Sequence, residues 1–413
     1  MYKKLIFCST IGEMLEGYDF ILYGLYAQIL AKLFFPTTDQ NLSLLVVYGS
    51  FAAGFFTRPL GGMIFGFIGD IFGRKKSFLL SLIIMGVPTI LIGLLPTYQT
   101  IGVLSPILLV LFRLIQGIAF GGEYTGAILF LGEHAPKSRT GLFCSFSCAG
   151  TLIGTLIGSI TVAITNWHYS QNITTWEWRI PFIFGGLIVI FSGFFRKKLQ
   201  ETPIFIKNRH HEISKSIIIK KIIDNKKILM LLFLMSIQMS IISYLSIVFL
   251  PTYLSNFLGI PNQKTFLINV LNTSILVLLI PLFGFLSDIW GRKPILLVSC
   301  FMTLFFSYPL YLLLQTQTLK SIILIQMVMV LLTAMSMSVI PSLILETIPS
   351  TFRASSISIA YNLAIAIFGG TTPFIATFLI HLTNNLAAPS YYLIFGSTVS
   401  LTALLMYKTP KKF

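Results

Sequence analysis

The chain has 413 residues, of which 55% are hydrophobic and only 10% are charged, and its mean hydropathy is +0.87. Soluble domains carry roughly a quarter charged residues, so this composition excludes an ordinary water-soluble protein. The formal net charge of +16 would suit nucleic-acid binding, but the basic residues are sorted by loop, which indicates membrane topology instead.

Twelve apolar stretches follow one another along the chain. Most are long enough to cross a hydrocarbon core of roughly 30 Å as a helix. We therefore expect an all-α integral membrane protein with twelve transmembrane helices. The expected spans are 10–35, 43–69, 77–95, 101–132, 142–165, 180–195, 227–255, 265–287, 294–314, 320–345, 355–381 and 389–407.

The first span carries three acids, Glu13, Glu16 and Asp19, at intervals of three residues, and Tyr23 follows one turn later. An acid at the centre of a membrane helix costs about 2.5–3.5 kcal/mol on insertion, so these side chains must face protein or water. They also interrupt the apolar core of a signal peptide, so we expect the span to be retained. Glu16 or Asp19 is a candidate to take up a coupled proton; the alternative is an ionised acid held by an arginine.

The second and eighth spans end in a repeated loop. Residues 66–75 read GFIGDIFGRK and residues 284–293 read GFLSDIWGRK. The glycines allow two helices to approach closely, and the acid can bind a helix N-terminus or an arginine. We expect each loop to be a latch that forms in one conformation and breaks in the other. The latch residues are Asp70, Arg74, Lys75, Asp288 and Arg292.

The repeat indicates two parallel copies of a six-helix unit, and a basic stretch divides the spans six and six. We expect an N-terminal bundle at 1–195, a cytoplasmic basic linker at 196–227 and a pseudo-symmetric C-terminal bundle at 228–413. Most Lys and Arg residues lie in the linker and in alternate loops, which predicts cytoplasmic termini. The opposite loops hold only Lys32, Arg179, Lys264 and Lys320.

The fourth span offers Arg113, whose guanidinium fork suits either a substrate carboxylate or an acid of the first span. Gln116 and Tyr124 follow roughly on its face. Glu123 lies ten residues on, about 15 Å along a helix, so it needs a partner of its own, for which we expect Arg58. Glu123 is a third candidate for proton coupling.

The C-terminal half contributes uncharged groups. Tyr244, Tyr361 and Asn362 are candidate pocket residues, because aromatic and amide groups can hold an ammonium or a carboxylate; the alternative is ordinary helix packing. Glu346 and Arg353 follow the tenth span as Glu133 and Arg139 follow the fourth. By this symmetry we expect all four to be gate charges on the cytoplasmic side.

Several segments carry a resemblance to a known family. They include Glu16-Gly-Tyr-Asp19 in the first span, Gly121-Gly-Glu123-Tyr124 in the fourth and Tyr361-Asn362 in the eleventh. With the two latch loops, they resemble the metabolite:proton symporter family of the major facilitator superfamily. Ile71 and Ile289 stand where the latch pattern often has a basic residue.

The resemblance implies a proton-coupled importer of a small zwitterion or organic acid, working by alternating access. Proline and glycine betaine are the first choice; a dicarboxylate or another organic acid is the alternative, and an exporter or a uniporter is a further rival. We expect a monomer in a bacterial inner membrane. No enzyme motif and no nucleic-acid site are expected, nor any cofactor besides the proton. Four cysteines lack metal-ligand spacing, so no metal site is expected.

Overall fold

The computed structural model describes residues 2–36, 40–168, 176–208 and 215–408. The regular structure in these ranges is helical, which confirms the predicted class. In the first part of the chain the helices are α1 (Tyr2–Leu25), α2 (Ala27–Phe34), α3 (Gln40–Phe72), α4 (Arg74–Leu94), α5 (Tyr98–Ile101), α6 (Leu104–His134), α7 (Thr140–His168), α8 (Arg179–Lys197), α9 (Pro203–Asn208) and α10 (Lys215–Asp224).

The second part of the chain continues in the same way, with short π-helical turns inside two of its spans. Its helices are α11 (Lys226–Tyr244), η1 (Leu245–Phe249), α12 (Leu250–Thr252), η2 (Tyr253–Phe257), α13 (Asn262–Trp290), α14 (Arg292–Leu314), α15 (Leu319–Thr347), η3 (Ser350–Phe352), α16 (Arg353–Ala364), η4 (Ile365–Gly369), α17 (Thr372–Thr383) and α18 (Pro389–Met406).

Within the described residues, eleven helical segments are long and apolar enough to cross a membrane. The remaining predicted span, the first, corresponds to α1, whose 24 residues give a length of about 36 Å. Its charged residues keep its hydropathy low. This first span differs from the prediction in two ways: α1 begins at Tyr2 rather than near residue 10, and a break at Tyr26 separates it from α2.

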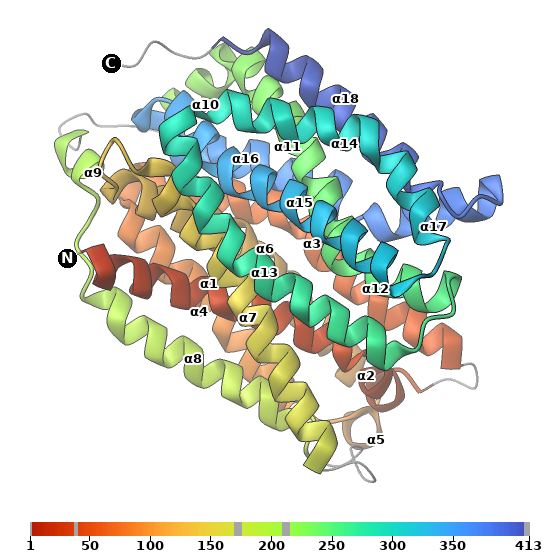
Figure 1. Cartoon of the computed structure of the whole chain (residues 1–413). Coiled ribbons are helices and arrows are strands. Elements are labelled where there is room, and N and C mark those ends of the chain that lie inside the picture. Colours follow the sequence, from red (N-terminus) through yellow and green to blue (C-terminus); the bar gives the residue numbers. More distant parts are fainter. Residues whose placement is uncertain (1, 37–39, 169–175, 209–214, 409–413) are drawn as a thin grey trace.

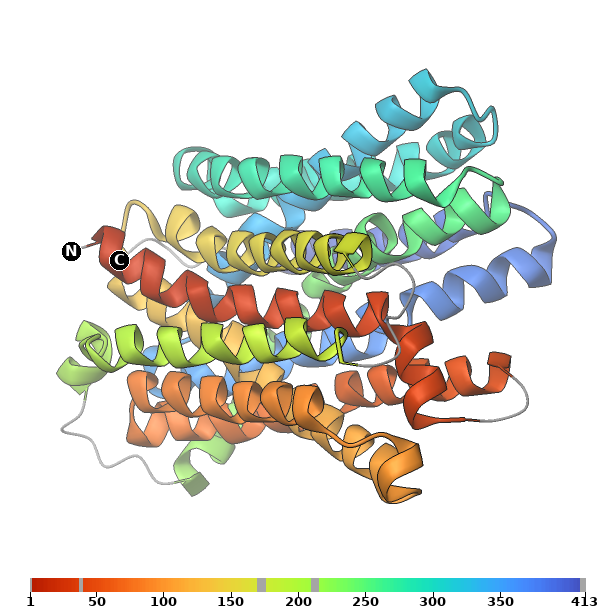
Figure 2. The same cartoon turned by 90° about the horizontal axis from the view of Figure 1, so that it is seen from below.

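Figures 1 and 2 show the long helices running in roughly one direction. We call residues 2–197 the N-terminal half and residues 226–408 the C-terminal half. Helix α8 continues to Lys197 and α11 begins at Lys226, so each helix extends two residues past the predicted bundle boundary. The halves meet mainly at two helix contacts: α3 packs against α16, and α7 packs against α13.

The two predicted latch loops lie at one end of the bundle, which we call the latch face. Gly73 between α3 and α4 has φ +111°, and Gly291 between α13 and α14 has φ +91°, a region that favours glycine. The chain ends of the described part lie there too: Tyr2 packs on Phe143 at the start of α7, and the carbonyl of Tyr407 accepts a hydrogen bond from Lys293.

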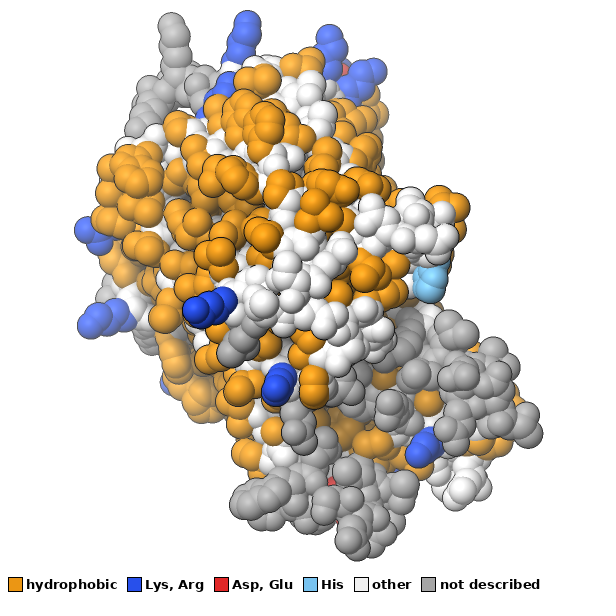
Figure 3. All heavy atoms as spheres, turned by 45° about the vertical axis from the view of Figure 1, so that its right-hand side comes forward, with side chains coloured by type: hydrophobic (Ala, Val, Ile, Leu, Met, Phe, Trp, Pro, Cys, Tyr) orange, Lys and Arg blue, Asp and Glu red, His pale blue; other side chains and the backbone are white. Residues whose placement is uncertain are grey.

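Large apolar side chains cover much of the outer surface, as Figure 3 shows for one side of the molecule. Phe56, Leu187, Leu278 and Phe305 are each more than half exposed. A soluble protein rarely exposes so much contiguous apolar area, and a bilayer is the solvent that suits it.

Candidate functional site

Charged side chains are concentrated inside the N-terminal half, between the cleft described below and the inner side of the latch face. This buried charge group contains four acids and three arginines, each at most 5% exposed. The three acids of α1 face protein, as predicted for groups that must avoid lipid. The buried charge group consists of Glu13, Glu16, Asp19, Arg58, Arg113, Glu123 and Arg196.

Asp19 is the best-satisfied acid of this group. Its Oδ2 accepts a hydrogen bond from Arg113 Nη1 at 2.7 Å, and its Oδ1 accepts bonds from Gln116 Nε2 at 2.9 Å and from the Thr89 hydroxyl at 3.1 Å. The guanidinium of Arg113 lies 3.7 Å from the centre of the Tyr23 ring. The structure therefore brings together four residues that the sequence singled out separately on α1 and α6.

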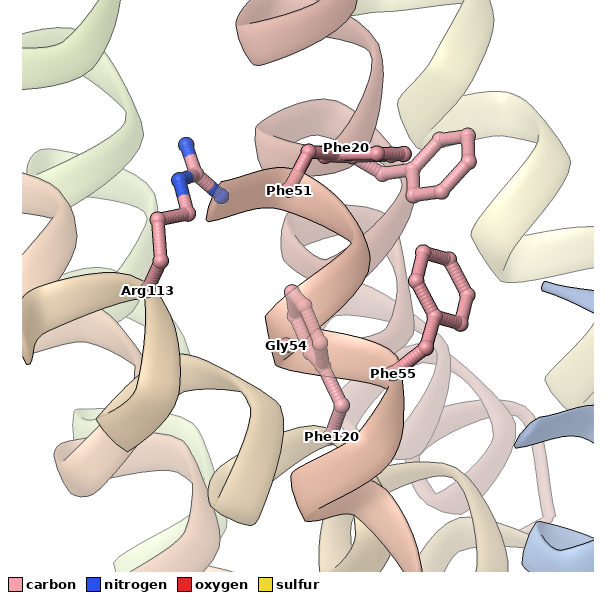
Figure 4. Close-up of a pocket in the computed structure, with 6 residues that line it drawn as sticks. All are labelled: Phe20, Phe51, Gly54, Phe55, Arg113 and Phe120. Carbon is pink, nitrogen blue, oxygen red and sulfur yellow. The ribbon is translucent and has the colours of Figure 1, made fainter. Parts of the chain in front are cut away.

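Arg113 also borders a narrow cleft between α1, α3 and α6. Its Nε and Nη2 make no hydrogen bond with the described residues, although both atoms are buried. Figure 4 shows Arg113 approaching from α6, with phenyl rings from three helices around the cleft. The arginine is nine residues from the start of α6 and 21 from its end, so the cleft lies nearer the face opposite the latches. The other lining residues are Phe20, Phe51, Gly54, Phe55 and Phe120.

The predicted pairing of Arg58 with Glu123 is wrong. Arg58 Nη2 instead lies 2.9 Å from Glu16 Oε1, and its guanidinium packs near the rings of Phe55 and Phe120. The turn of α3 that carries Arg58 faces α1 as well as α6, which spacing along the chain does not reveal. Through these two rings, which line the cleft, the Arg58–Glu16 pair lies beside the cleft.

Glu123 pairs with Arg196 of α8, and both side chains are fully buried. Arg196 also donates to the carbonyls of Cys8, Ser9 and Phe78, and Glu123 accepts from the hydroxyl of Ser81. Arg196 was expected to be the first residue of the solvated linker, so this expectation is corrected. Its donors satisfy carbonyls and one acid inside the bundle, where an unpaired charge would cost several kcal/mol.

The candidates from the C-terminal half lie in the contact between the halves. Tyr361 stacks on Tyr124 with 5.0 Å between ring centres, and Asn362 Nδ2 donates to the carbonyl of Gly121 at 2.9 Å. Tyr244 meets Phe55 edge to face at 5.8 Å, beside the cleft. Of these three, Tyr244 is the residue placed closest to the cleft lining.

The first latch is closed. Asp70 accepts hydrogen bonds from the backbone N–H groups of Ala354 and Ser355 at 3.1 and 3.0 Å, at the start of α16, and from the Ser355 hydroxyl at 2.7 Å. Arg74 Nη1 binds Asp70 at 2.9 Å, and Arg74 Nη2 donates to the carbonyl of Ser350. An acid of the N-terminal half thus caps a helix of the C-terminal half, where it also meets the positive end of the helix dipole.

The second latch repeats the arrangement with the halves exchanged. Asp288 accepts from the backbone N–H groups of Gly141 and Leu142 at 2.8 and 3.0 Å, at the start of α7. Arg292 pairs with Asp288 and with Glu346, each at 2.7 Å. The predicted pseudo-symmetry therefore holds at the level of single hydrogen bonds.

The remaining residues predicted for the gate and latch are Glu133, Arg139, Arg353 and Lys75. Glu133 lies 3.2 Å from Arg353 Nη1 and 3.5 Å from Arg74 Nε, so it joins the two halves. Arg139 is exposed and makes no ion pair with the described residues. Lys75 donates from its Nζ to the carbonyl of Lys197, and its backbone N–H binds Glu201.

Sequence reasoning missed two groups that build the site. The phenyl rings of Phe20, Phe51 and Phe55 line the cleft, but aromatic residues in apolar spans give no signal of their own. Arg196 ends an apolar run, where the sorting of basic residues to one side makes it look ordinary. No group of three or more His, Cys, Asp or Glu residues in the described ranges could hold a metal, and the four cysteines are buried and form no disulfide within these ranges.

Comparison with known proteins gives consistent results. The family model described as Major Facilitator Superfamily matches residues 11–373. A citrate-proton symporter of Klebsiella pneumoniae is 33% identical over 95% of this chain and 89% of its own length. A glycine betaine/proline/ectoine/pipecolic acid transporter, OusA, of Dickeya dadantii is 31% identical over 99% of this chain and 84% of its own.

Solved structures agree on the fold. A double tryptophan mutant of XylE has a TM-score of 0.78 at 16% identity, over 97% of this chain and 94% of that one. The proton:xylose symporter XylE bound to a bromodeoxyglucose gives a TM-score of 0.75 at 17% identity, over 98% and 94% of the two chains. With twelve helical spans, two closed latches and these matches, the chain belongs to the major facilitator superfamily and is a membrane transporter of small molecules, not an enzyme.

Proposed function

We propose that this transporter imports a small zwitterion, with proline or glycine betaine as first candidates, in symport with a proton and without a cofactor. The observation that carries the proposal is Arg113, which lines the cleft and whose Nε and Nη2 make no hydrogen bond with the described residues. A buried guanidinium with free donors is suited to bind a carboxylate in a two-pronged geometry.

The cleft also offers a place for the positive end of such a substrate. Four phenyl rings surround it, and the face of an aromatic ring attracts a quaternary or secondary ammonium group by about 0.5–2 kcal/mol. The arginine and the rings border the same narrow cleft, so a small molecule with both charges would engage them together once the rings move apart.

Asp19 is the candidate that links the proton to the substrate. It shares Arg113 with the proposed carboxylate, so protonation of Asp19 would release Nη1 for the substrate. Glu16 and Glu123 stay candidates, because each is held by a single arginine in the same bundle.

Within this proposal, the closed latches indicate to which side of the membrane the transporter is open. With both termini in the cytoplasm of a bacterial inner membrane, the latch face is the cytoplasmic face. The cleft then lies nearer the outer side, so this state is one in which substrate enters from outside. Opening towards the cytoplasm requires Asp70 and Asp288 to leave the helix N-termini that they cap.

An organic acid with more than one carboxylate is the second candidate. Arg58 Nε is buried and unbonded among the described residues, and its guanidinium packs near Phe120 of the cleft lining. A second carboxylate at this position would suit a substrate such as that of the citrate-proton symporter relative.

Uptake into proteoliposomes tests the proposal. Labelled proline, glycine betaine, 2-oxoglutarate, citrate and shikimate are offered with and without an imposed inward proton gradient. Accumulation of proline or betaine only with the gradient is the expected result. Accumulation of citrate or 2-oxoglutarate alone would select the second candidate, and uptake that ignores the gradient would contradict symport.

A further inference from the structure

One acid of the buried charge group is left over when the others have been paired. Glu16 pairs with Arg58, Asp19 with Arg113, and Glu123 with Arg196. These pairs use all three arginines. Glu13, which is 0% exposed, makes no ion pair within the described residues.

The surroundings of Glu13 do not compensate for a negative charge. Its Oε2 accepts one hydrogen bond, from the Thr151 hydroxyl of α7 at 3.3 Å. Its Oε1 has no partner among the described residues, and the hydroxyls of Ser9 and Ser147, one turn before Glu13 and Thr151, also make no hydrogen bond with them. A buried carboxylate with one weak donor lacks most of the solvation that it would have in water.

The charged neighbours make ionisation less favourable still. Glu16 on the same helix and Glu123 on α6 are acids, and Arg196 on α8 is the cation within reach. Helix α7 presents Cys148, a neutral thiol, and α4 presents Ser81, which is bonded to Glu123.

Arg196 is already committed. It donates to Glu123 and to three backbone carbonyls on α1 and α4. Gly12 fixes this arrangement, because a Cβ at that position would collide with the guanidinium of Arg196 and the carboxylate of Glu123. Rotation of Arg196 towards Glu13 would break bonds that buried carbonyls and a buried acid need.

We infer that Glu13 carries a proton in this conformation and is a proton-binding site inside the N-terminal half, separate from the substrate cleft. A neutral carboxylic acid removes the uncompensated charge and gains an O–H donor for one of the unsatisfied oxygens nearby. The binding of this proton is independent of the proposed function. Its use as the coupled proton rests on that function.

The position of Glu13 connects the proton to the contact between the halves. Thr151, its hydrogen-bond donor, is three residues from Cys148 on α7. The Cys148 thiol bonds the Tyr124 hydroxyl at 2.7 Å and the carbonyl of Met337, in the C-terminal half, at 3.3 Å. Loss of the proton would draw Glu13 towards Arg196 and change the α1–α7 contact one turn from that interface.

Infrared spectroscopy of the purified protein in lipid tests whether the proton is there. The carbonyl stretch of a protonated carboxylic acid is expected in the wild type and absent in Glu13→Gln. Glu16→Gln is the matched control, because this acid lies one turn away and is paired, and it should leave the band in place. Thr151→Val should shift the band without abolishing it. A wild-type spectrum without the band, or a band lost only in Glu16→Gln, would overturn the inference.

Transport then distinguishes the two levels of the proposal. Glu13→Gln should keep substrate counterflow, which needs no net proton movement, and reduce gradient-driven accumulation to the level seen without a gradient. If wild-type uptake ignores the proton gradient, the proposed symport fails while the infrared result stands. If Glu13→Gln accumulates substrate as the wild type does, the coupling role of Glu13 fails. Accumulation driven by sodium and lost in this variant would replace the proton with a metal cation.

Discussion

The two halves share one architecture but differ inside. The N-terminal half buries the seven charged side chains of the buried charge group, whereas no Asp, Glu, Lys or Arg of the described C-terminal half is buried. Amides and hydroxyls hold that half together: Gln238 binds Ser299 and Thr303, each at 3.2 Å, and Ser246 binds Thr333 at 3.0 Å. Its acids, Asp288 and Glu346, lie at the latch face, where both pair with Arg292.

If transport is coupled to a proton as proposed, this difference separates two tasks that a symporter must combine. Charge interactions strengthen as the local dielectric constant falls, so one proton can reorganise the N-terminal half. Neutral hydrogen bonds are weaker and insensitive to a proton gradient. The C-terminal half can therefore move as a body against a partner whose internal bonds depend on protonation.

Breaking a buried ion pair should destabilise the protein most. Arg196→Met removes the partner of Glu123 and the donor to three carbonyls, and we expect a loss of about 3–5 kcal/mol in stability. Thermal unfolding in detergent measures it.

The matched change in the other half is Gln238→Leu, which removes two neutral bonds and should cost about 1 kcal/mol. Equal losses of stability in the two variants would show that the buried ion pair contributes no more to stability than the neutral hydrogen bonds.

Changing the cation of the cleft should have the next largest effect. Arg113→Lys keeps the charge but removes the planar fork, so substrate affinity should fall about tenfold, or about 1.4 kcal/mol. Binding is measured by titration calorimetry or by the half-saturation of counterflow. Tyr244→Phe, from the C-terminal half, keeps its ring against Phe55 and should change affinity by less than about twofold. Unchanged affinity in Arg113→Lys would remove the arginine from the substrate site.

The latches should show the smallest difference between the halves. Asp70→Asn loses the charge that caps α16 and pairs with Arg74, and Asp288→Asn loses the same role at α7. Each should weaken closure of the latch face by about 1 kcal/mol. The readout is the rate at which a maleimide labels Cys148, which is buried between the halves. Both variants should label faster than the wild type, and a slower rate in either would contradict its role in closure.

Much of the fold follows from hydrophobicity alone. The fifth span, expected at 142–165, is α7 at Thr140–His168, because a long apolar helix in lipid satisfies its own backbone. The first span was less well placed. Lys3 and Lys4 lower the local hydropathy, so the helix that begins at Tyr2 has no apolar signal in its first turns.

The site was predictable in its members more than in its partners. The sequence identified four members of the site one by one, because polar side chains are costly in lipid and therefore mark contacts with protein or substrate. These residues are Asp19, Tyr23, Arg113 and Gln116. Which arginine meets which acid depends on how α1, α3, α6 and α8 are rotated against each other, and one sequence does not contain that information. The pairing of Arg196 with Glu123 is the clearest case.

Both latch acids bind mainly to backbone N–H groups across the interface, at positions 141, 142, 354 and 355. Every residue type except proline supplies the same donor there. The backbone donors at these four sites therefore survive a change of side chain, but two of the sites are constrained for other reasons. A Cβ at position 141 would collide with Arg292 and with the carbonyl of Gly284, and the Ser355 hydroxyl is itself a donor to Asp70. During divergence Leu142, which is half-buried, can exchange its side chain without loosening the contact, whereas a substitution to proline is a change that all four sites should resist.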